Sequence, residues 1–449
     1  MSADAVALLR ALIREACVNT GDPASGGEIR AVRVLQRFFA GTAIETHVFE
    51  AAPGRASLIA RVRGTDPSAP ALGLVGHLDV VPVDAAKWTR DPFGGDLIDG
   101  EVWGRGAVDM LYLTAAFAAV VREAARAPAP PRGDLVLLAV ADEEAGSDLG
   151  LRWLLREHPA ATSVTEVLSE TGGMRMGRHV AIDVAEKGSA GRRLVVRGRP
   201  GHASIPYGAQ SAAYHAGEVL RRLALVEPAV ELGPLWGAFV AARVADPLLA
   251  ERMLDPVRVD TALAELDGIA GYAHAISRTT ISPTVLRAGQ AHNVIPGEAR
   301  IDLDIRTLPG TTDDQVDDLL LSMLGEHAPA VKLVRLRGWP ASESPVDTPL
   351  FAAVSRAVEA VAGVPVVPIM AAGGSDARLF RELGIPAYGF GVLSERWSYE
   401  RYRERIHSHD ERIDVASVQL TIDALRLLVA DRVGAAVTAS AMIAASVAD

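Results

Sequence analysis

The residues of this sequence that could do chemistry are histidines and carboxylates that directly follow short apolar segments. The first two are His77 and Asp79 in GHLDVVP, which follows the apolar run ALGLV. Residues two apart on an extended chain share a face, so the Asp79 carboxylate can orient the His77 ring. A metal-bound histidine usually donates its other ring N–H to such a partner. The alternative is a buried histidine beside a turn aspartate.

Three further segments place carboxylates after apolar or glycine-rich stretches. Asp109 in GRGAVDM precedes a strongly helical pattern, where an aspartate that caps the helix is also common. Asp142, Glu143 and Glu144 follow the apolar run LVLLAVA, and Glu170 follows VLS. Three successive carboxylates at the end of a buried strand repel one another, which favours a bound cation or proton. A solvated acidic turn is the alternative.

Two more histidines, His407 and His409, stand far downstream in IHSHDERI, in what could also be a surface loop. Together the clusters offer nitrogen and oxygen ligands without sulfur, because Cys17 is the single cysteine. Such ligands suit zinc, or manganese or cobalt in its place. Five of them can hold two metals bridged by one carboxylate. A remaining carboxylate is then free to act as the general base of a two-metal hydrolase.

Alternating strands and helices must position these clusters. SLIARVRG, ALGLVGHLDVVP and DLVLLAVA are predicted strands, and the helical patterns lie at 111–127 and in DLGLRWLLREHP. Apolar runs of this kind are typical of strands buried on both faces. The alternation favours an α/β layer with a largely parallel sheet.

The pattern changes near Glu186. RRLVVRGR, ARIDLDIRTL and VKLVRLR alternate as half-buried strands do, with helical stretches at 213–226 and 313–324. Apolar runs return after Trp339, followed by predicted helices at 349–361 and 376–383. We therefore expect a catalytic α/β domain with a mixed, mainly parallel sheet (1–186 and 339–449). A smaller α+β domain (187–338) interrupts it.

Composition narrows the class of protein. The 449 residues include 56 acidic and 45 basic ones, which gives a formal charge of -11. A protein with this balance is a poor nucleic-acid binder, because phosphate binding needs a basic surface. No uninterrupted apolar run reaches about 18 residues, so no membrane span is expected. The alanine-rich tail VGAAVTASAMIAASVAD comes nearest, but Gly, Thr and Ser break it. The first residues lack the features of a signal peptide, so we expect a cytoplasmic protein.

The motifs in this order resemble the zinc-dependent amidohydrolases and peptidases. That family includes aminoacylase, acetylornithine deacetylase, succinyl-diaminopimelate desuccinylase, carboxypeptidase G and carboxypeptidase S. The matching segments cover most of the chain and are GHLDVVP, GRGAVDM, DEEAGS, SETGG, GHASIP, NVIPGEARIDLDIR, GGSDAR and IHSHDERI. One departure is Leu111–Tyr112, where the family commonly has Lys-Gly after the Asp-Met pair.

The resemblance implies two zinc ions, with cobalt or manganese as substitutes, and a role for each site residue. His77 and Glu170 would bind one metal, Glu144 and His407 the other, and Asp109 would bridge them. His409 is the rival of His407, but Glu411 lies four residues after His407, as in the family. The peptide bond after Asp109 is expected to be cis.

Catalytic roles also follow from the resemblance. Asp79 would orient His77, and Glu143 would take the proton from water and give it to the leaving amine. In the inserted domain, a lid that usually forms the dimer interface, His202 would stabilise the oxyanion, within one subunit or across a homodimer. Asn293 and Arg306 would contact the substrate.

The glycine-rich segment GGSDAR is, besides Arg306, a second candidate for binding the substrate carboxylate. Gly373, Gly374 and Ser375 precede a helix, and their backbone N–H groups could hold the substrate carboxylate. Asp376 would more simply cap that helix. For Arg306, the alternative to gripping a carboxylate is a surface salt bridge.

The expected activity is hydrolysis of an amide bond in a small substrate with a free carboxylate next to the amide nitrogen. N-acyl amino acids, short peptides and N-carbamoyl compounds fit, as in the carboxypeptidase S and N-acyl-amino-acid hydrolase branch. A dedicated biosynthetic deacylase, acting on succinyl-diaminopimelate or acetylornithine, is the alternative. A catalytically silent relative that only binds a ligand is a further one. No nucleic-acid or membrane partner is expected.

Overall fold

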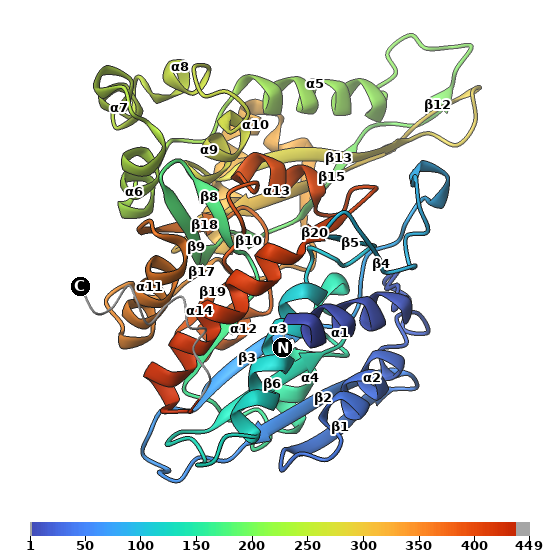
Figure 1. Ribbon diagram of the computed structural model, residues 1–449. Coiled ribbons are helices and arrows are strands. Elements are labelled where there is room, and N and C mark those ends of the chain that lie inside the picture. The colour runs from blue at the N-terminus through green and yellow to red at the C-terminus, as the bar shows by residue number, and fades with distance from the viewer. Residues whose placement is uncertain (1, 437–449) are drawn as a thin grey trace.

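The computed structural model describes residues 2–436, and its central element is a six-stranded sheet (Figure 1). The strand order is β1-β2-β6-β3-β7-β19. Their bounds are β1 (Glu45–Ala52), β2 (Arg55–Val62), β3 (Leu72–His77), β6 (Leu135–Val140), β7 (Glu166–Ser169) and β19 (Ala387–Gly389). β6, β3, β7 and β19 run parallel, while β1 and β2 are antiparallel to their neighbours. The predicted mixed, mainly parallel sheet is confirmed.

Helices cover both faces of this sheet, which explains its apolar runs. On β6, Leu135, Leu137 and Ala139 join one core cluster, and the alternate residues Val136 and Leu138 join another. The first cluster contains side chains of α1 (Ser2–Arg14), α2 (Ile29–Phe39), α3 (Leu111–Ala125) and α14 (Val415–Val433). The second contains side chains of α4 (Leu151–Glu157) and α12 (Ala377–Glu382). A strand between two helical layers has no polar face, so its sequence does not alternate.

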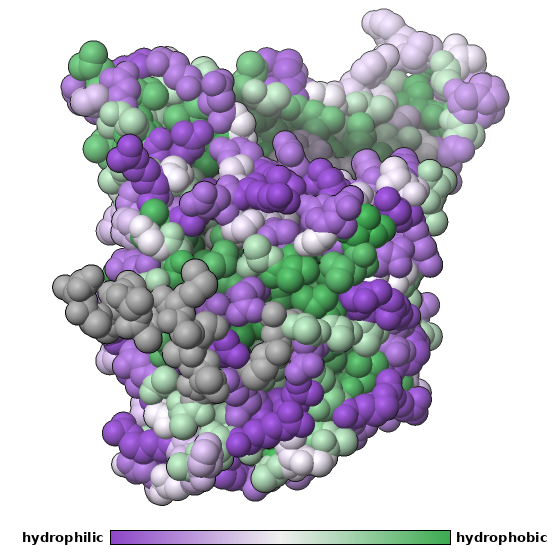
Figure 2. All heavy atoms as spheres, in the orientation of Figure 1, coloured by the Kyte–Doolittle hydropathy of each residue, from purple (hydrophilic) through white to green (hydrophobic). Residues whose placement is uncertain are grey.

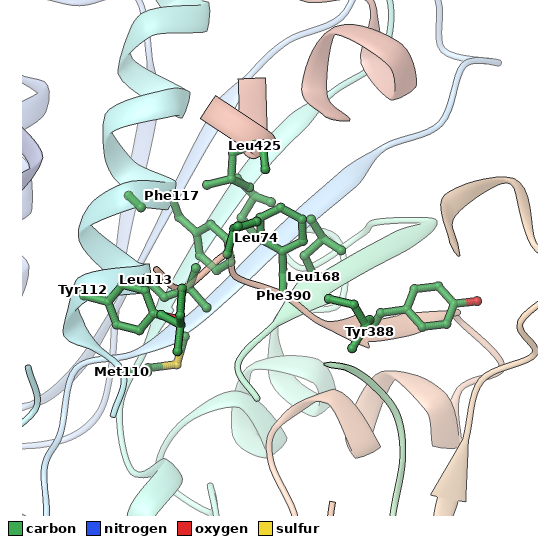
Figure 3. Close-up of a cluster of buried hydrophobic side chains, with 14 of the residues drawn as sticks. Leu74, Met110, Tyr112, Leu113, Phe117, Leu168, Tyr388, Phe390 and Leu425 are labelled. Carbon is green, nitrogen blue, oxygen red and sulfur yellow. The ribbon is translucent and has the colours of Figure 1, made fainter. Parts of the chain in front are cut away.

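The first cluster is rich in aromatic and aliphatic side chains close to the site. Figure 3 shows Phe117 of α3 and Leu425 of α14 gathered around Leu74 and Phe390. Tyr112, which stands where the resembling family has glycine, is buried in this core at the start of α3. The departure at Leu111–Tyr112 therefore adds apolar packing behind the site.

A second sheet continues the catalytic part of the chain. It contains β8 (Gly172–Met176), β9 (His179–Glu186), β17 (Ser342–Glu343) and β18 (Val366–Ala371). α11 (Pro349–Ala362) precedes β18 and ends at Gly363, whose φ of 67° is the left-handed conformation that favours glycine. A small third sheet pairs β4 (Asp96–Ile98), β5 (Glu101–Trp103) and β20 (Arg412–Asp414).

The inserted segment begins as the predicted α+β unit. Its antiparallel sheet contains β10 (Gly188–Ser189), β11 (Arg192–Arg197), β13 (Thr280–Ala288), β15 (Glu298–Thr307) and β16 (Val331–Arg335). α5 (Ala212–Leu225) and α10 (Asp313–Leu324) cover one face, where Ile301, Leu303 and Ile305 of β15 are buried. The predicted alternation of β15 is confirmed. A capping box of Thr312 and Gln315 starts α10 at the predicted residue.

Four helices in the middle of the inserted segment pack on the catalytic part instead. They are α6 (Pro234–Arg243), α7 (Pro247–Met253), α8 (Val259–Leu263) and α9 (Ala270–Ile276). Trp236 and Phe239 belong to the same core cluster as α3 and α14. The Tyr272 hydroxyl donates to the Met370 carbonyl at 2.9 Å, and its ring lies 4.4 Å from that of Tyr399. The domain boundaries at 186/187 and 338/339 remain a prediction.

A thin arm projects from the inserted segment at the upper right of Figure 1. It pairs β12 (Gly201–His202) with β14 (Val294–Ile295). Ile205 and Tyr207 near its tip are 74% and 100% exposed. In Figure 2, apolar residues gather along the recess between this arm and the lobe of α6–α9.

The structure tests two expectations from the sequence: the absence of a membrane-spanning helix and the capping of α12 by Asp376. Within the described part of the chain, no helix combines the length and apolar character needed to cross a membrane. Most of the alanine-rich tail, residues 437–449, lies outside the described residues. The expectation that Asp376 caps α12 is wrong: its side chain makes no cap hydrogen bond and instead accepts one from the Ser147 hydroxyl.

Candidate metal centre and active site

The site lies at the carboxyl ends of three adjacent parallel strands. His77 is the last residue of β3, Glu143 and Glu144 lie in a short 3-10 turn (Glu143–Ala145) after β6, and Glu170 follows β7. β3 lies between β6 and β7 in the sheet, so these side chains emerge at one edge. Ligands typically bind at this edge of open α/β sheets.

Asp109 lies between two groups of potential ligands. Its Oδ1 is 3.3 Å from His77 Nε2, and its Oδ2 is 3.1 Å from His407 Nε2. His77 Nε2 is also 3.8 Å from Glu170 Oε2, and His407 Nε2 is 3.4 Å from Glu144 Oε2. The two oxygens of one carboxylate thus face two separate sets of side chains. This is the arrangement expected of a bridging ligand.

The turn that carries Asp109 is held by a buried carboxylate. The Asp109–Met110 peptide bond is cis, as expected. Glu411, which is fully buried, accepts hydrogen bonds from the backbone N–H groups of Gly106, Val108 and Asp109, at 3.1, 2.7 and 3.0 Å. It also accepts one from Arg105 Nη1 at 2.7 Å. Glu411 therefore fixes the backbone that presents the bridging aspartate.

Asp79 supports the site mainly through the neighbouring turn. His77 Nδ1 lies 2.8 Å from the Asp79 backbone carbonyl and 3.7 Å from the Asp79 carboxylate. The carboxylate itself accepts hydrogen bonds from the N–H groups of Glu143 and Glu144, at 3.2 and 3.1 Å. The main chain of Asp79 thus orients the ring, and its side chain holds the Glu143–Glu144 turn.

The electrostatics of the cluster reflect crowded carboxylates. Burial, followed by the charge of Asp109, raises the pKa of Glu170 to about 8. Burial and then the charge of Glu170 raise the pKa of Glu143 well above its usual range. Hydrogen bonds to Asp109 and Glu144 raise the pKa of His407 to about 10. Burial opposes ionisation of Asp109, but its hydrogen bonds to His407 and His77 outweigh this and lower its pKa.

These donors fit divalent metal ions. Ligand atoms of His77, Asp109 and Glu144 lie within 4.8 Å of one another, as do those of His77, Glu143 and Glu170. Glu144 Oε1 is buried without a hydrogen-bond partner, which is costly unless a cation or ligand satisfies it. Histidine nitrogens and carboxylate oxygens are zinc ligands, and also suit manganese and cobalt. Both His407 and His409 are exposed, but it is His407 that contacts Asp109 and Glu144 of the cluster.

A pocket opens beside the cluster. Asp109, Glu143, Glu144, Glu170 and His407 form one end, and Gly373 and Gly374 line it further along. Ser375 also lines the pocket, but its donors are already hydrogen-bonded to another residue. Its N–H and hydroxyl donate to Glu186 at 2.9 and 2.6 Å, so within the glycine-rich segment Gly373 and Gly374 are the remaining candidates for a substrate carboxylate.

Arg306 lies in a neighbouring part of the cleft. It lines a second hollow together with Glu143, Glu144 and His407. Its guanidinium pairs with Asp304 through two hydrogen bonds, at 2.8 and 3.0 Å. The side chain therefore makes the salt bridge that sequence analysis considered and also borders the site.

His202 and Asn293 lie together on the arm, apart from the residues that line these two hollows. The Ala203 N–H donates to the Asn293 carbonyl at 3.0 Å, and His202 Nδ1 contacts the Ser204 hydroxyl at 2.7 Å. Neither His202 nor Asn293 is among the described residues that line the two hollows. Their predicted roles therefore require a partner subunit or a movement of the arm.

Sequence analysis missed several buried polar residues around the site. Asn19 donates to Asp79, and Asp183 and Glu186 line the pocket. One signal was available: Asp183 interrupts the apolar run of β9, where a charge needs a specific partner. Glu411 was used only to choose between His407 and His409. Nothing in the local sequence around Asn19 points to its role.

The comparisons with known proteins agree with this geometry. The family model described as Peptidase family M20/M25/M40 matches residues 73–431. A succinyl-diaminopimelate desuccinylase of Cereibacter sphaeroides is 31% identical over 431 residues, covering 93% of this chain and 96% of that protein. A protein with the same name from Xanthomonas campestris pv. campestris is 27% identical over 380 residues, covering 80% and 83%.

Solved structures show the same fold. An M20 family metallo-carboxypeptidase from Sulfolobus solfataricus superimposes with a TM-score of 0.69 at 18% identity, covering 95% of this chain and 98% of that chain. Human carnosine dipeptidase 1 gives a TM-score of 0.65 at 18% identity, covering 96% of each.

Proposed function

The chain belongs to Peptidase family M20/M25/M40 and is a metal-dependent hydrolase, and we propose that it cleaves an amide bond in a small carboxylate-bearing substrate. The observation that carries the proposal is Asp109, whose two oxygens face His77 and His407 separately. We assign one metal to His77, Asp109 and Glu170, and the other to Asp109, Glu144 and His407.

Zinc is the proposed metal, because the donors are imidazole nitrogens and carboxylate oxygens. When bound, the two ions supply Lewis acidity and lower the pKa of a water molecule. Glu143 reaches the same cluster without being needed as a ligand in this assignment. Its carboxyl is suited by its place in the cluster to accept a proton from water and to return it to the leaving amine, and burial raises its pKa above the usual carboxyl range.

Arg306, Gly373 and Gly374 are the proposed contacts for the substrate carboxylate. Arg306 offers a planar fork of donors, although it must exchange part of its pairing with Asp304. The two glycines leave their backbone accessible at the pocket wall. Ser375 contributes indirectly, because its bonds to Glu186 fix the segment that contains both glycines.

A homodimer would bring a second arm to each site. The exposed His202 and Asn293 support this, because both lie away from their own pocket. The antiparallel sheet also leaves β13 as an exposed strand with Leu286 at its surface. We propose that His202 of one subunit stabilises the oxyanion in the site of its partner. The cytoplasmic location remains a prediction.

A dedicated biosynthetic deacylase is the second candidate. The curated relative named succinyl-diaminopimelate desuccinylase, similar over nearly the whole chain, favours it. Such an enzyme would prefer an N-succinyl substrate strongly over N-acetyl amino acids and dipeptides.

The test is hydrolysis of N-acetyl amino acids, dipeptides and N-succinyl-diaminopimelate by zinc-loaded wild type and by Glu143→Ala, with metal content measured in both. We expect turnover by wild type and a loss of at least about a thousandfold in the variant, with both metals retained. Bound metal without turnover on any substrate would refute the proposed substrate class. Turnover that survives in Glu143→Ala would refute the assigned base.

A further inference from the structure

A buried polar network lies directly behind the turn that carries Glu143 and Glu144. Its members are at most 4% exposed and come from four separate segments: Asn19, Glu28, Arg55, Asp79 and Asp142. Asp142, the residue before the turn, has a φ of 67°, an uncommon conformation for a residue with a side chain. The backbone therefore leaves β6 in a geometry that its surroundings must hold.

Asn19 joins the two halves of this network. Its side-chain Nδ2 donates to Asp79 Oδ2 at 2.9 Å and to Asp142 Oδ1 at 3.0 Å. Its Oδ1 accepts the Gly21 N–H at 2.9 Å. All three contacts agree on one orientation of the amide, because carboxylates accept and a backbone N–H donates.

One half of the network leads from Asn19 to the catalytic turn. Asp79, held by Asn19, accepts the N–H of Glu143 with one oxygen and that of Glu144 with the other. Two successive hydrogen bonds therefore connect the Asn19 amide to the backbone of the proposed base and of a proposed metal ligand. A shift of Asp79 would move both residues.

The other half anchors Asp142 to the start of the fold. Arg55 Nη2 donates to Asp142 Oδ1 at 2.8 Å, and the same guanidinium holds Glu28 through Nε and Nη2, at 2.9 and 2.8 Å. Asp142 Oδ2 accepts the Leu149 N–H at 2.9 Å. Two carboxylates, Glu28 and Asp142, thus share one guanidinium. The neutral Asn19 amide supplies donors to Asp142 and Asp79 without adding charge.

We propose that Asn19 is a positioning residue: by coupling Asp79 to Asp142, it sets the orientation of the Glu143–Glu144 turn for metal binding and proton transfer. The inference rests on the proposed function for its catalytic half only. The effect of Asn19 on the placement of Glu144 can be measured as Zn²⁺ affinity, which needs no turnover.

The experiment compares Asn19→Ala with Val34→Ala, a matched control that removes an apolar side chain of α2 from the core cluster but removes no hydrogen bond of the network. For each protein we would measure the melting temperature without metal, Zn²⁺ affinity by competition with a chelator, and kcat and KM. Loss of a group that orients a metal ligand costs about 10–100-fold in affinity or activity.

We expect Asn19→Ala to bind the more weakly held Zn²⁺ about 10–100-fold less tightly and to lose a similar factor in kcat, with KM within about threefold. Val34→Ala should keep its Zn²⁺ affinity and kcat at the wild-type level even if it melts at a lower temperature. Equal behaviour of the two variants at equal melting temperature would overturn the inference, because Asn19 would then be merely structural.

Two further outcomes keep the test decisive. If wild type hydrolyses no substrate, the proposed function fails, while the Zn²⁺ affinities still decide the role of Asn19. If Asn19→Ala does not fold, Arg55→Lys is used instead, because lysine keeps the charge but cannot hold both Glu28 and Asp142 through a planar fork. Arg55→Lys should then weaken Zn²⁺ binding about tenfold, and wild-type affinity in that variant would overturn the inference.

Discussion

Replacing Glu411 by alanine should loosen the turn that presents Asp109. The carboxylate is fully buried and accepts three backbone N–H groups and the Arg105 guanidinium. Removing one partner of a buried ion pair costs about 3–5 kcal/mol, since the remaining charge stays buried. Arg105 is 3% exposed and would be left in that state. We expect Glu411→Ala to lower the free energy of unfolding of the metal-free protein by about 4 kcal/mol.

Glu411→Gln separates charge from shape. Glutamine keeps one acceptor oxygen but places an NH₂ group against N–H donors, so we expect a loss of about 1–3 kcal/mol. The exposed Glu404, on the helix α13 (Tyr399–Arg405), is the matched control, and Glu404→Gln should change stability by less than about 0.5 kcal/mol. Urea denaturation followed by tryptophan fluorescence measures all three. A loss below about 1 kcal/mol in Glu411→Ala would refute the reasoning that this carboxylate holds the turn.

Four other predictions concern two buried side chains, the pocket wall and the bound metal. Burial raises the pKa of Cys17 to about 12, so Ellman's reagent at pH 8 should label no thiol until the protein is denatured, and then one per chain. Burial lowers the pKa of Lys187 from 10.5 to about 7, so the unfolded state binds more protons between these values. The stability of wild type relative to Lys187→Met should therefore rise with pH from 7 to 10.5, by at most about 1.4 kcal/mol per pH unit in urea titrations, and a flat difference would contradict this. A Cβ on Gly374 would lie 2.9 Å from the Trp339 indole nitrogen, so Gly374→Ala should reduce kcat/KM at least about tenfold in steady-state assays while melting as wild type does; unchanged kinetics would place the substrate elsewhere. Removing metal with a chelator should lower stability by about 2.7 kcal/mol for each metal site that was held at a hundred times its Kd, measured by thermal unfolding.

Much of the fold could be predicted because each sheet imposes its own hydrophobic pattern. The continuous apolar run of β6 reflects helices on both faces, and the alternation of β15 reflects a sheet covered by helices on one face. The helices α6–α9 were not predicted in detail. They belong by sequence to the inserted segment, but their apolar side chains join the core cluster of the catalytic part, and no local pattern says which of two cores a short helix joins.

For the candidate site, the proposed metal ligands could be predicted from the sequence, but the residues that hold them in place could not. The ligands His77, Asp109, Glu144 and Glu170 could be found because each directly follows a recognisable apolar or glycine-rich segment, whereas His407 was found only through the resemblance of IHSHDERI to the family. The support behind them could not, since Asn19 meets partners that lie 60 and 123 residues away in the sequence. The commitment of Ser375 to Glu186 is also a tertiary contact, over 189 residues, and only the folded chain reveals it.

A crystal structure of the zinc-loaded protein, with anomalous scattering recorded at the zinc edge, would show whether Asp109 bridges two metal ions. We expect two peaks, about 3.5–4 Å apart, one on each side of the Asp109 carboxylate. One peak should be bound by His77 and Glu170 and the other by Glu144 and His407. A single peak, or two that do not share Asp109, would contradict the assignment of a bridged two-metal centre.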